Sequence, residues 1–197
     1  KQRIASPLNM KSTMITLTPA LKKNMAMPYF VYGYPTVNWQ NPGMEGCGGA
    51  LSNMNDMLTF AAANAGLIKT DLFPAMELTH IKQGKKDGND GFITMGWTII
   101  NEDNEHILWK DGATGGYRTF IGIDKKKKYG IIILSNAGIN QVTDIGLHIL
   151  DSASAYEPYK YQFTLADTLN ATIKTKGIDA CIALYHQLKA RKTKDEF

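Results

Sequence analysis

The sequence contains few cysteines and no long apolar run. Cys47 and Cys181 are the two cysteines among 197 residues, and no Cys-x-x-Cys pair occurs. We therefore expect neither a disulfide nor a cysteine metal site. Cys47 lies among glycines with no histidine close in sequence, which favours a packing role over a catalytic thiol. No run is long enough for a transmembrane helix or a signal peptide core.

Histidine is also sparse, and the basic charge is not arranged for nucleic acid. The four histidines (His80, His106, His148 and His186) lack the short spacing typical of metal ligands, so we expect no metal and no cofactor. The net charge of +4 comes partly from Lys125–Lys128 and is not interleaved with aromatic residues. We therefore expect no nucleic-acid partner, and we interpret the lysine run as a solvated turn.

The composition is that of a globular protein, with 44% hydrophobic and 20% charged residues. We predict one domain over residues 1–153. Residues 154–197 are predicted to form a helical hairpin tail, and the pattern leaves open that a further helical domain starts there. The first residue is Lys1 rather than methionine. We interpret Lys1 as a processed or cut end.

Alternating apolar residues predict an antiparallel meander in the second half of the first domain. Its expected strands are Phe92–Ile100, Glu105–Lys110, Tyr117–Ile123 and Tyr129–Leu134. Asn140 is expected to cap a helix that covers one sheet face with Val142, Ile145, Ile149 and Leu150. The predicted fold class is therefore α+β: an antiparallel sheet flanked by helices, with a C-terminal helical appendage.

Further helices are predicted from caps and apolar spacing. Thr18 and Pro19 start a short helix that reaches about Met25, and Met27–Gly49 reads as a long irregular loop. Ser52 is the expected cap of a helix whose core face carries Met54, Met57, Leu58, Ala61, Ala62 and Ala65. The tail helices are expected at Thr164–Lys174 and Gly177–Ala190, with Ile178, Cys181, Ile182 and Tyr185 on one side of the second.

Three segments resemble one enzyme family. Trp109–Asn136, which contains Lys-Asp-Gly-Ala-Thr-Gly-Gly, resembles the Lys/His-Thr-Gly strand and hairpin of class C serine β-lactamases and the related penicillin-binding D-alanine carboxypeptidases and esterases. Gly48–Met57 resembles the Gly-Gly-Leu-x-Ser-x-x-x-Asp-Met segment of that family, and Pro7–Thr13 resembles a third segment. The resemblance covers about Ser6–Leu150 and implies the C-terminal part of a β-lactamase/transpeptidase-like fold.

The resemblance also implies roles for residues of the lysine strand. Lys110 would supply positive potential, and the backbone N–H of Ala113 would belong to an oxyanion hole, so both are the predicted catalytic groups. The predicted substrate-binding residues are Asp111, Gly112, Thr114 and Arg118. Asp111 replaces the usual threonine, and its carboxylate would repel an anionic substrate. An ester, amide or peptide substrate fits that substitution at least as well as a β-lactam.

The nucleophile of the family is missing from this sequence. Neither Ser-x-x-Lys nor Tyr-x-Asn occurs, and Thr79 and Lys82, which have the first spacing with a threonine, are interpreted as a surface helix end. We therefore expect a portion of a serine hydrolase that is inactive alone. The alternative is a non-catalytic domain that binds a peptide or cell-wall fragment.

The resemblance implies the remaining expectations about partners and location. The expected partners are a small-molecule or peptide substrate and the missing N-terminal part of the same domain. A homodimer is also expected, through the unpaired strand edge Tyr129–Leu134. A periplasmic or extracytoplasmic location follows only from the resemblance.

Overall fold

The computed structural model describes residues 1–197 except 32, 40–41, 86–90, 140, 152–164 and 193–197. The chain divides into two compact units, Lys1–Glu157 and Pro158–Phe197. The predicted boundary at Ala153 and the predicted helix cap Asn140 lie outside the described residues.

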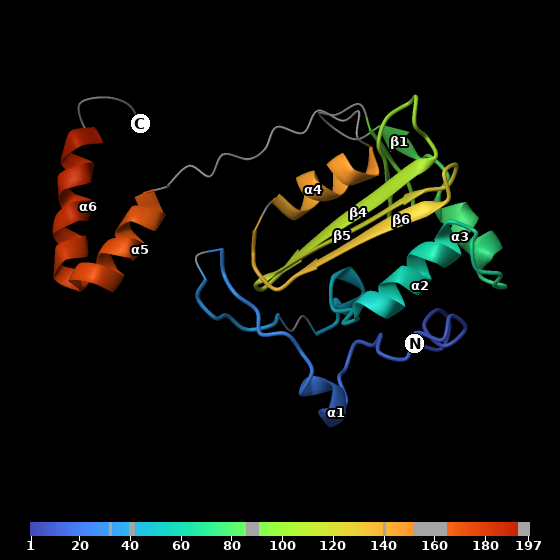
Figure 1. Ribbon diagram of the computed structural model, residues 1–197, viewed down its shortest axis with the longest axis horizontal. Helices are drawn as coiled ribbons and strands as arrows, with labels where there is room; N and C mark the ends of the chain where they lie inside the picture. The colour runs from blue at the N-terminus through green and yellow to red at the C-terminus, as the bar shows by residue number, and fades with distance from the viewer. Residues whose placement is uncertain (32, 40–41, 86–90, 140, 152–164, 193–197) are drawn as a thin grey trace. The chain divides into compact units, whose positions relative to one another are not determined.

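The first unit is built on an antiparallel sheet in which each strand pairs with its neighbours in sequence (Figure 1). Its strands are β1 (Gly84–Lys85), β2 (Phe92–Ile93), β3 (Thr98–Ile99), β4 (Ile107–Thr114), β5 (Tyr117–Asp124) and β6 (Tyr129–Ser135). The three long strands pair along almost their whole length, from Ile107 opposite Asp124 to Arg118 opposite Ser135. The predicted α+β meander is confirmed.

The segment Phe92–Ile100 is not the single strand that its alternation predicts. Phe92 pairs with Ile99 across a tight turn, so β2 and β3 form a hairpin. The turn closes with a 3.0 Å bond from the Thr94 N–H to the Trp97 carbonyl. Gly96 has φ +95° there, which a residue with a side chain rarely adopts. The alternating apolar pattern therefore runs through the turn at Gly96, which is why it predicted one strand where the structure has two.

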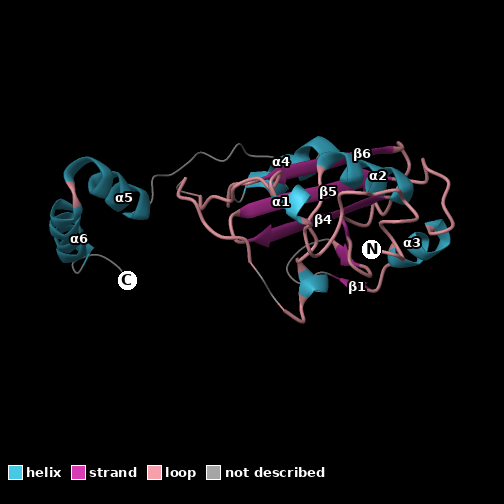
Figure 2. Cartoon of the chain, turned by 90° about the horizontal axis from the view of Figure 1, so that it is seen from below, coloured by secondary structure: helices cyan, strands magenta, loops and turns pink. Residues whose placement is uncertain are grey.

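Helices cover the two faces of the long strands. Helix α2 (Met54–Asn64) lies against one face and α4 (Gln141–Leu150) against the other, as Figures 1 and 2 show. On the α2 face, Ala61 packs with the paired residues Leu108 and Ile123. A second cluster fills the α4 face, with Ile107, Trp109, Phe120, Val142 and Leu150. The sheet therefore has an apolar layer on each side, as α+β packing requires.

Helix α2 begins one residue later than predicted and exposes part of its expected core face. Asn53 is the cap, and its side chain accepts a 2.9 Å bond from the Asp56 N–H. Ala61 and Ala65 are buried as predicted, but Met54 and Leu58 are 41% and 45% exposed. That part of the prediction is wrong because apolar spacing marks one side of a helix without fixing what lies against it.

Helix α4 packs through a slightly different stripe from the predicted one. Val142 and Leu150 are buried as expected, whereas Ile145 and Ile149 are 38% and 55% exposed. The contact stripe is Val142, Gly146 and Leu150, spaced four residues apart. A Cβ on Gly146 would lie 2.4 Å from the Phe120 ring. The missing side chain at Gly146 therefore lets α4 approach the sheet along this stripe.

The N-terminal residues pack beside α2. Ala5, Leu8 and Met10 are buried against Ala63 and against Met76 of α3 (Phe73–Thr79). The Asp56 carboxylate accepts bonds from the Ser12 N–H and the Thr13 hydroxyl at 2.8 and 2.7 Å. Two other short elements are α1 (Pro19–Lys22), which starts after the predicted Thr18 cap but ends three residues before Met25, and the 3-10 turn Glu45–Cys47.

The second unit is a helical hairpin of α5 (Leu165–Lys176) and α6 (Ile178–Lys192), and Gly177 between them has φ +85°. Of the four apolar residues predicted to share one side, Cys181 is buried, whereas Ile178, Ile182 and Tyr185 are 65%, 50% and 42% exposed. Cys47 and Cys181 are both free thiols. Within the described residues, no helix has the length and apolar character needed to cross a membrane.

Candidate functional site

Strand β4 has a partner on one side along its whole length but on the other side only at its start. Strand β3 pairs with Leu108 and Trp109, and the described strands provide no further partner on that side. From Lys110 to Thr114, β4 therefore pairs with β5 alone. The residues predicted to form the site thus lie along an open strand edge.

The direction of the backbone groups on this edge follows from the hydrogen bonds at the start of β4. The Ile107 carbonyl accepts a 3.2 Å bond from the Ile100 N–H, on the β3 side, while the His106 carbonyl accepts from Lys125, on the β5 side. Successive residues of a strand alternate the sides to which their polar groups point. The N–H groups of Asp111 and Ala113 therefore face the open edge. Ala113 is also exposed to solvent.

Lys110 lies on the face of the sheet that α2 covers. It pairs with Ile121, which packs against the core cluster on that face. Its side chain is 56% exposed, and Nζ lies 3.9 Å from Asp111 Oδ1. At that separation and exposure the ion pair contributes little to stability. The ammonium group is thus available at the surface beside the open edge.

Asp111 points to the opposite face, toward α4. Its Oδ2 accepts a 2.9 Å bond from the hydroxyl of Thr143 in α4. Arg118 is paired with Ala113, so it shares the face of Asp111 and lies diagonal to it. The sequence did not indicate Thr143 because it lies 32 residues from Asp111 and belongs to no motif.

The two other predicted substrate-binding residues lie on the Lys110 face. A Cβ on Gly112 would lie 2.8 Å from the Thr119 hydroxyl, so a larger residue there would displace that hydroxyl. Thr114, at the end of β4, lies beside the Gly48-Gly49 loop: a Cβ on Gly48 would be 3.6 Å from its methyl group. Gly48 and Thr114, from two motifs far apart in sequence, therefore meet at one end of the open edge.

The turn after β4 packs closely against the loop Met27–Gly49. A Cβ on Gly115 would lie 2.5 Å from the Trp39 ring, and one on Gly116, where φ is +81°, would lie 2.8 Å from the Tyr29 nitrogen. Trp39 is itself 56% exposed. The close approach explains why two glycines stand at this turn.

Hydrogen bonds fix that loop to the sheet. The Tyr117 hydroxyl donates to the Ala26 carbonyl at 2.6 Å, and burial raises the pKa of this phenol, which keeps it protonated. Asn136 donates its amide to the Met27 carbonyl at 2.8 Å and accepts from the Tyr29 N–H at 2.9 Å. The end of β6, predicted as part of the site region, thus holds the loop beside the end of β4.

The other candidates are engaged elsewhere. Thr79 donates to the Met76 carbonyl, and Lys82 forms a 2.9 Å ion pair with Glu105 and lies 3.6 Å from the centre of the Phe92 ring. Thr79 and Lys82 are therefore a helix end and a surface cation, as interpreted from the sequence. In the part of the chain that the structure describes, no three residues of the His, Cys, Asp and Glu types gather into a group able to hold a metal ion.

The family model described as Beta-lactamase matches residues 1–152. The chain belongs to the Beta-lactamase family. This membership confirms the resemblance on which the site residues were predicted, and it covers the whole first unit of the described structure. No curated protein sequence matches the chain.

Solved structures of this family share the fold. The chain resembles a β-lactamase/D-alanine carboxypeptidase from Pseudomonas syringae with a TM-score of 0.66 and 21% identity, over 80% of this chain and 52% of that one. It resembles the D-alanine carboxypeptidase AmpC from Burkholderia cenocepacia with a TM-score of 0.69 and 21% identity, over 77% and 54%. It also resembles a class C β-lactamase from Rhodobacter sphaeroides with a TM-score of 0.67 and 18% identity, over 77% of this chain and 52% of that one. The chain thus spans about half the length of these relatives.

Proposed function

We propose that residues 1–152 supply one wall of the active site of a serine hydrolase that acts on amide, ester or peptide bonds through an acyl-serine intermediate. The observation that carries this proposal is the open edge of β4, because the Ala113 N–H and the exposed Lys110 side chain both lie on that unpaired stretch of the strand. We also propose that the protein acts in the periplasm or elsewhere outside the cytoplasm, as expected from the resemblance.

The proposed chemistry assigns one step to each of these groups. A serine oxygen from the complementary part of the domain bonds to the substrate carbonyl carbon, and the carbonyl oxygen becomes an oxyanion. The Ala113 N–H, which points out of the edge, donates to that oxygen, a placement whose loss typically costs about 10²–10³ in kcat. The serine proton passes to a base in the complementary part and then to the leaving group, whose bond to the carbonyl carbon breaks as the oxyanion collapses to the acyl-serine. Water then hydrolyses the acyl-serine and restores the serine hydroxyl. Lys110 contributes positive potential to that network.

Exposed apolar side chains on the α2 side of the sheet favour a complementary polypeptide that covers them. Ile121 and Ile132 are only partly buried on that face, and Leu134 is 40% exposed. Met54 and Leu58 of α2 are exposed as well. A soluble domain seldom leaves so many apolar side chains of one layer open, and the related structures are about twice as long as the matched region. We therefore propose that the remainder of the domain packs on this surface.

The position of Asp111 supports a substrate with little negative charge near the lysine strand. Asp111 carries its carboxylate beside the open edge, since its own N–H faces that edge. Lys110 neutralises this negative charge only weakly, because the two charged groups are 3.9 Å apart and both are exposed to solvent. A substrate carboxylate on this edge would meet that negative charge. Neutral esters, amides and uncharged peptide segments are therefore the proposed substrates.

The reading frame that precedes Lys1 is the first test. If it encodes Ser-x-x-Lys and Tyr-x-Asn, the longer polypeptide is expressed and treated with a fluorophosphonate, and the expected result is a single adduct on that serine by intact mass.

Lys110→Ala is expected to slow p-nitrophenyl ester turnover markedly. Lys126→Ala, an exposed lysine of the β5–β6 turn, is the matched control and should not. Residues 1–197 alone should show no turnover above buffer. Unchanged turnover in Lys110→Ala would refute the assigned role.

The same edge also favours a second function, the binding of an extended peptide. Between Lys110 and Thr114, β4 has no described partner on one side, and there Asp111 and Ala113 leave their backbone groups available for a further strand. If the upstream frame has no Ser-x-x-Lys, this binding function replaces the enzyme. A peptide that binds should then protect the Asp111 and Ala113 amides from hydrogen exchange, whereas a failure to protect them contradicts it.

A further inference from the structure

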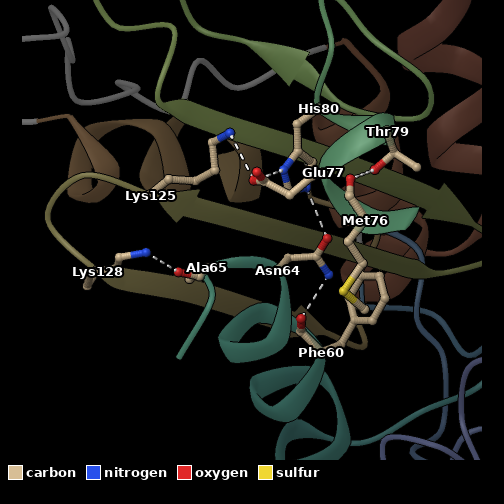
Figure 3. A network of polar contacts seen from close by, with 9 residues as sticks. All are labelled: Phe60, Asn64, Ala65, Met76, Glu77, Thr79, His80, Lys125 and Lys128. Atoms are coloured by element: carbon tan, nitrogen blue, oxygen red, sulfur yellow. Dashed lines mark hydrogen bonds and ion pairs between the residues drawn. The ribbon is translucent and has the colours of Figure 1, made fainter. Parts of the chain in front are cut away.

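A polar cluster around the buried residues Asn64 and His80 joins three elements at the end of the sheet where β4 begins (Figure 3). It includes Asn64 and Ala65 at the end of α2, Glu77 and His80 at the end of α3, and Lys125 and Lys128 in the turn between β5 and β6. None of these residues belongs to the open edge of β4. The cluster thus needs an explanation apart from the proposed hydrolase.

The hydrogen bonds around Asn64 decide where the proton of His80 lies. The Asn64 amide nitrogen donates to the Phe60 carbonyl at 2.9 Å, so its oxygen faces His80. That oxygen lies 3.1 Å from His80 Nε2 and can only accept. The neutral imidazole therefore carries its proton on Nε2, and Nδ1 has a lone pair.

This Nδ1 atom is buried and has no hydrogen-bond partner. The His80 side chain is 2% exposed, with its ring edge to face against Trp97 at 5.9 Å. Glu77 Oε1 lies 3.7 Å from this atom, which is too long for a hydrogen bond. A lone pair that faces a carboxylate cannot bond to it, but a proton on Nδ1 would supply the missing donor.

Glu77 lies beside both His80 and Lys125, which would compete for its carboxylate once His80 is protonated. The same Oε1 lies 3.7 Å from Lys125 Nζ. Lys125 comes from the β5–β6 turn, whereas His80 and Glu77 lie within one helical turn of each other. Lys128 fixes the turn independently, since its ammonium donates to the Ala65 carbonyl at 2.7 Å.

We propose that His80, Glu77 and Lys125 form a proton-operated switch, in which protonation of His80 at Nδ1 moves the Glu77 carboxylate from Lys125 to His80. The Nδ1–H then donates to Glu77, and Lys125 loses its ion pair with α3. The β5–β6 turn stays attached to α2 through Lys128. Acid therefore loosens α3 from this turn without separating the turn from α2.

The charges around the cluster set the conditions for this exchange. Desolvation by burial, followed by the charge of Lys125, lowers the pKa of His80 to about 4, and Glu77 acts in the opposite direction. Helix α2 contributes no charged group beside the ring, only Asn64. In the turn, Asp124 lies 3.7 Å from His106 and 3.9 Å from Lys127, and it does not contact His80. Exchange is thus expected near pH 4 in the unaltered chain.

The test follows the histidine resonances by NMR as a function of pH in residues 1–197. The His80 signal is assigned by its loss in His80→Gln. Lys125→Met is expected to raise the midpoint of the His80 titration, because it removes a competing cation. Glu77→Gln is expected to lower the midpoint, because it removes the negative charge that favours the protonated ring. Lys126→Met, one position along the same turn, should leave the midpoint unchanged and controls for net charge.

Two further measurements decide the mechanism. The ¹⁵N shifts of neutral His80 should report the Nε2–H tautomer, and the Lys125 Nζ resonance should move with the same midpoint as His80. A neutral Nδ1–H tautomer would overturn the proposal. So would a Lys125 resonance that does not respond to the His80 titration, or equal effects of Lys125→Met and Lys126→Met. Near-UV circular dichroism at each pH establishes that the chain is folded throughout.

Discussion

Thr143 of α4 holds the carboxylate of Asp111 with a 2.9 Å hydrogen bond. The bond links the helix on one face of the sheet to the strand that carries Lys110 and Ala113. Asp111 thus acts as a connection to α4 as well as a charge near the substrate edge. Removing its charge and removing its partner should therefore have different effects.

Asp111→Asn keeps the shape of the side chain and its bond to Thr143 but removes the charge. In the longer polypeptide that contains the nucleophile, kcat/KM for anionic substrates should rise relative to that for a neutral ester, because repulsion at the edge is lost. Thr143→Val should instead lower the free energy of unfolding by about 1 kcal/mol, without changing the substrate ratio. The comparison is made with one anionic and one neutral p-nitrophenyl ester. An unchanged ratio in Asp111→Asn would count against the charge argument.

Ala113→Pro removes the single N–H assigned to the oxyanion. Because that N–H faces away from β5, the β4–β5 ladder should survive, as prolines on strand edges do. We expect kcat of the longer polypeptide to fall by about 10²–10³, with a small change in KM. Ala113→Gly, which keeps the N–H, should retain most of the activity. If both variants lose activity equally, the loss reflects strand geometry rather than the missing donor.

Gly146→Ala should destabilise the first unit. The added methyl group would lie 2.4 Å from the Phe120 ring, which is 1% exposed and cannot move away. Overpacking of this kind costs about 1–3 kcal/mol, measurable as a lower urea midpoint. Gly46→Ala is the control, since nothing lies within 4 Å of its Cβ position. A wild-type midpoint in Gly146→Ala would mean that α4 can shift on the sheet.

Acid should destabilise the first unit through His80. The pKa of His80 is about 4 when folded, against 6.5 for an unperturbed histidine, so the unfolded chain binds the proton more tightly. The free energy of unfolding should therefore fall as the pH drops from about 6.5 toward 4, by roughly 3 kcal/mol. His80→Gln should flatten this part of the profile of urea stability against pH. His186→Gln, in the other compact unit, should leave it as in the wild type. A flat wild-type profile would contradict the shift.

The edge of β6 should pair with a second copy when the complementary part is absent. Among the described strands, β6 pairs only with β5, and Leu134 on it is 40% exposed. Unpaired edges of this kind promote association. Size-exclusion with light scattering should show a dimer of residues 1–197 at high concentration, and Ile132→Lys should shift it to a monomer. A strict monomer at all concentrations would refute this expectation.

Local signals in the sequence determined the existence and order of most elements. Thr18 and Pro19 start α1 because the cap and the fixed φ of proline act within one helical turn. The meander of long strands followed from alternation, and the lysine strand from its motif, since both depend on neighbours in the chain. The same local logic failed at Phe92–Ile100, where the turn at Gly96 interrupts an alternating pattern without changing it.

Only the tertiary structure decided which groups meet. Alternation along β4 points the Ala113 N–H away from β5, and the short β3, which pairs no further along β4 than Trp109, leaves it unpaired. No residue near Ala113 in sequence specifies the length of β3. Thr143 meets Asp111 because Gly146 lets α4 settle on Phe120, a contact between distant segments. Likewise, Lys125 reaches Glu77 beside His80 because α3 and the β5–β6 turn pack together. A sequence fixes local conformation through short-range sterics, whereas these contacts depend on how separate apolar surfaces share one core.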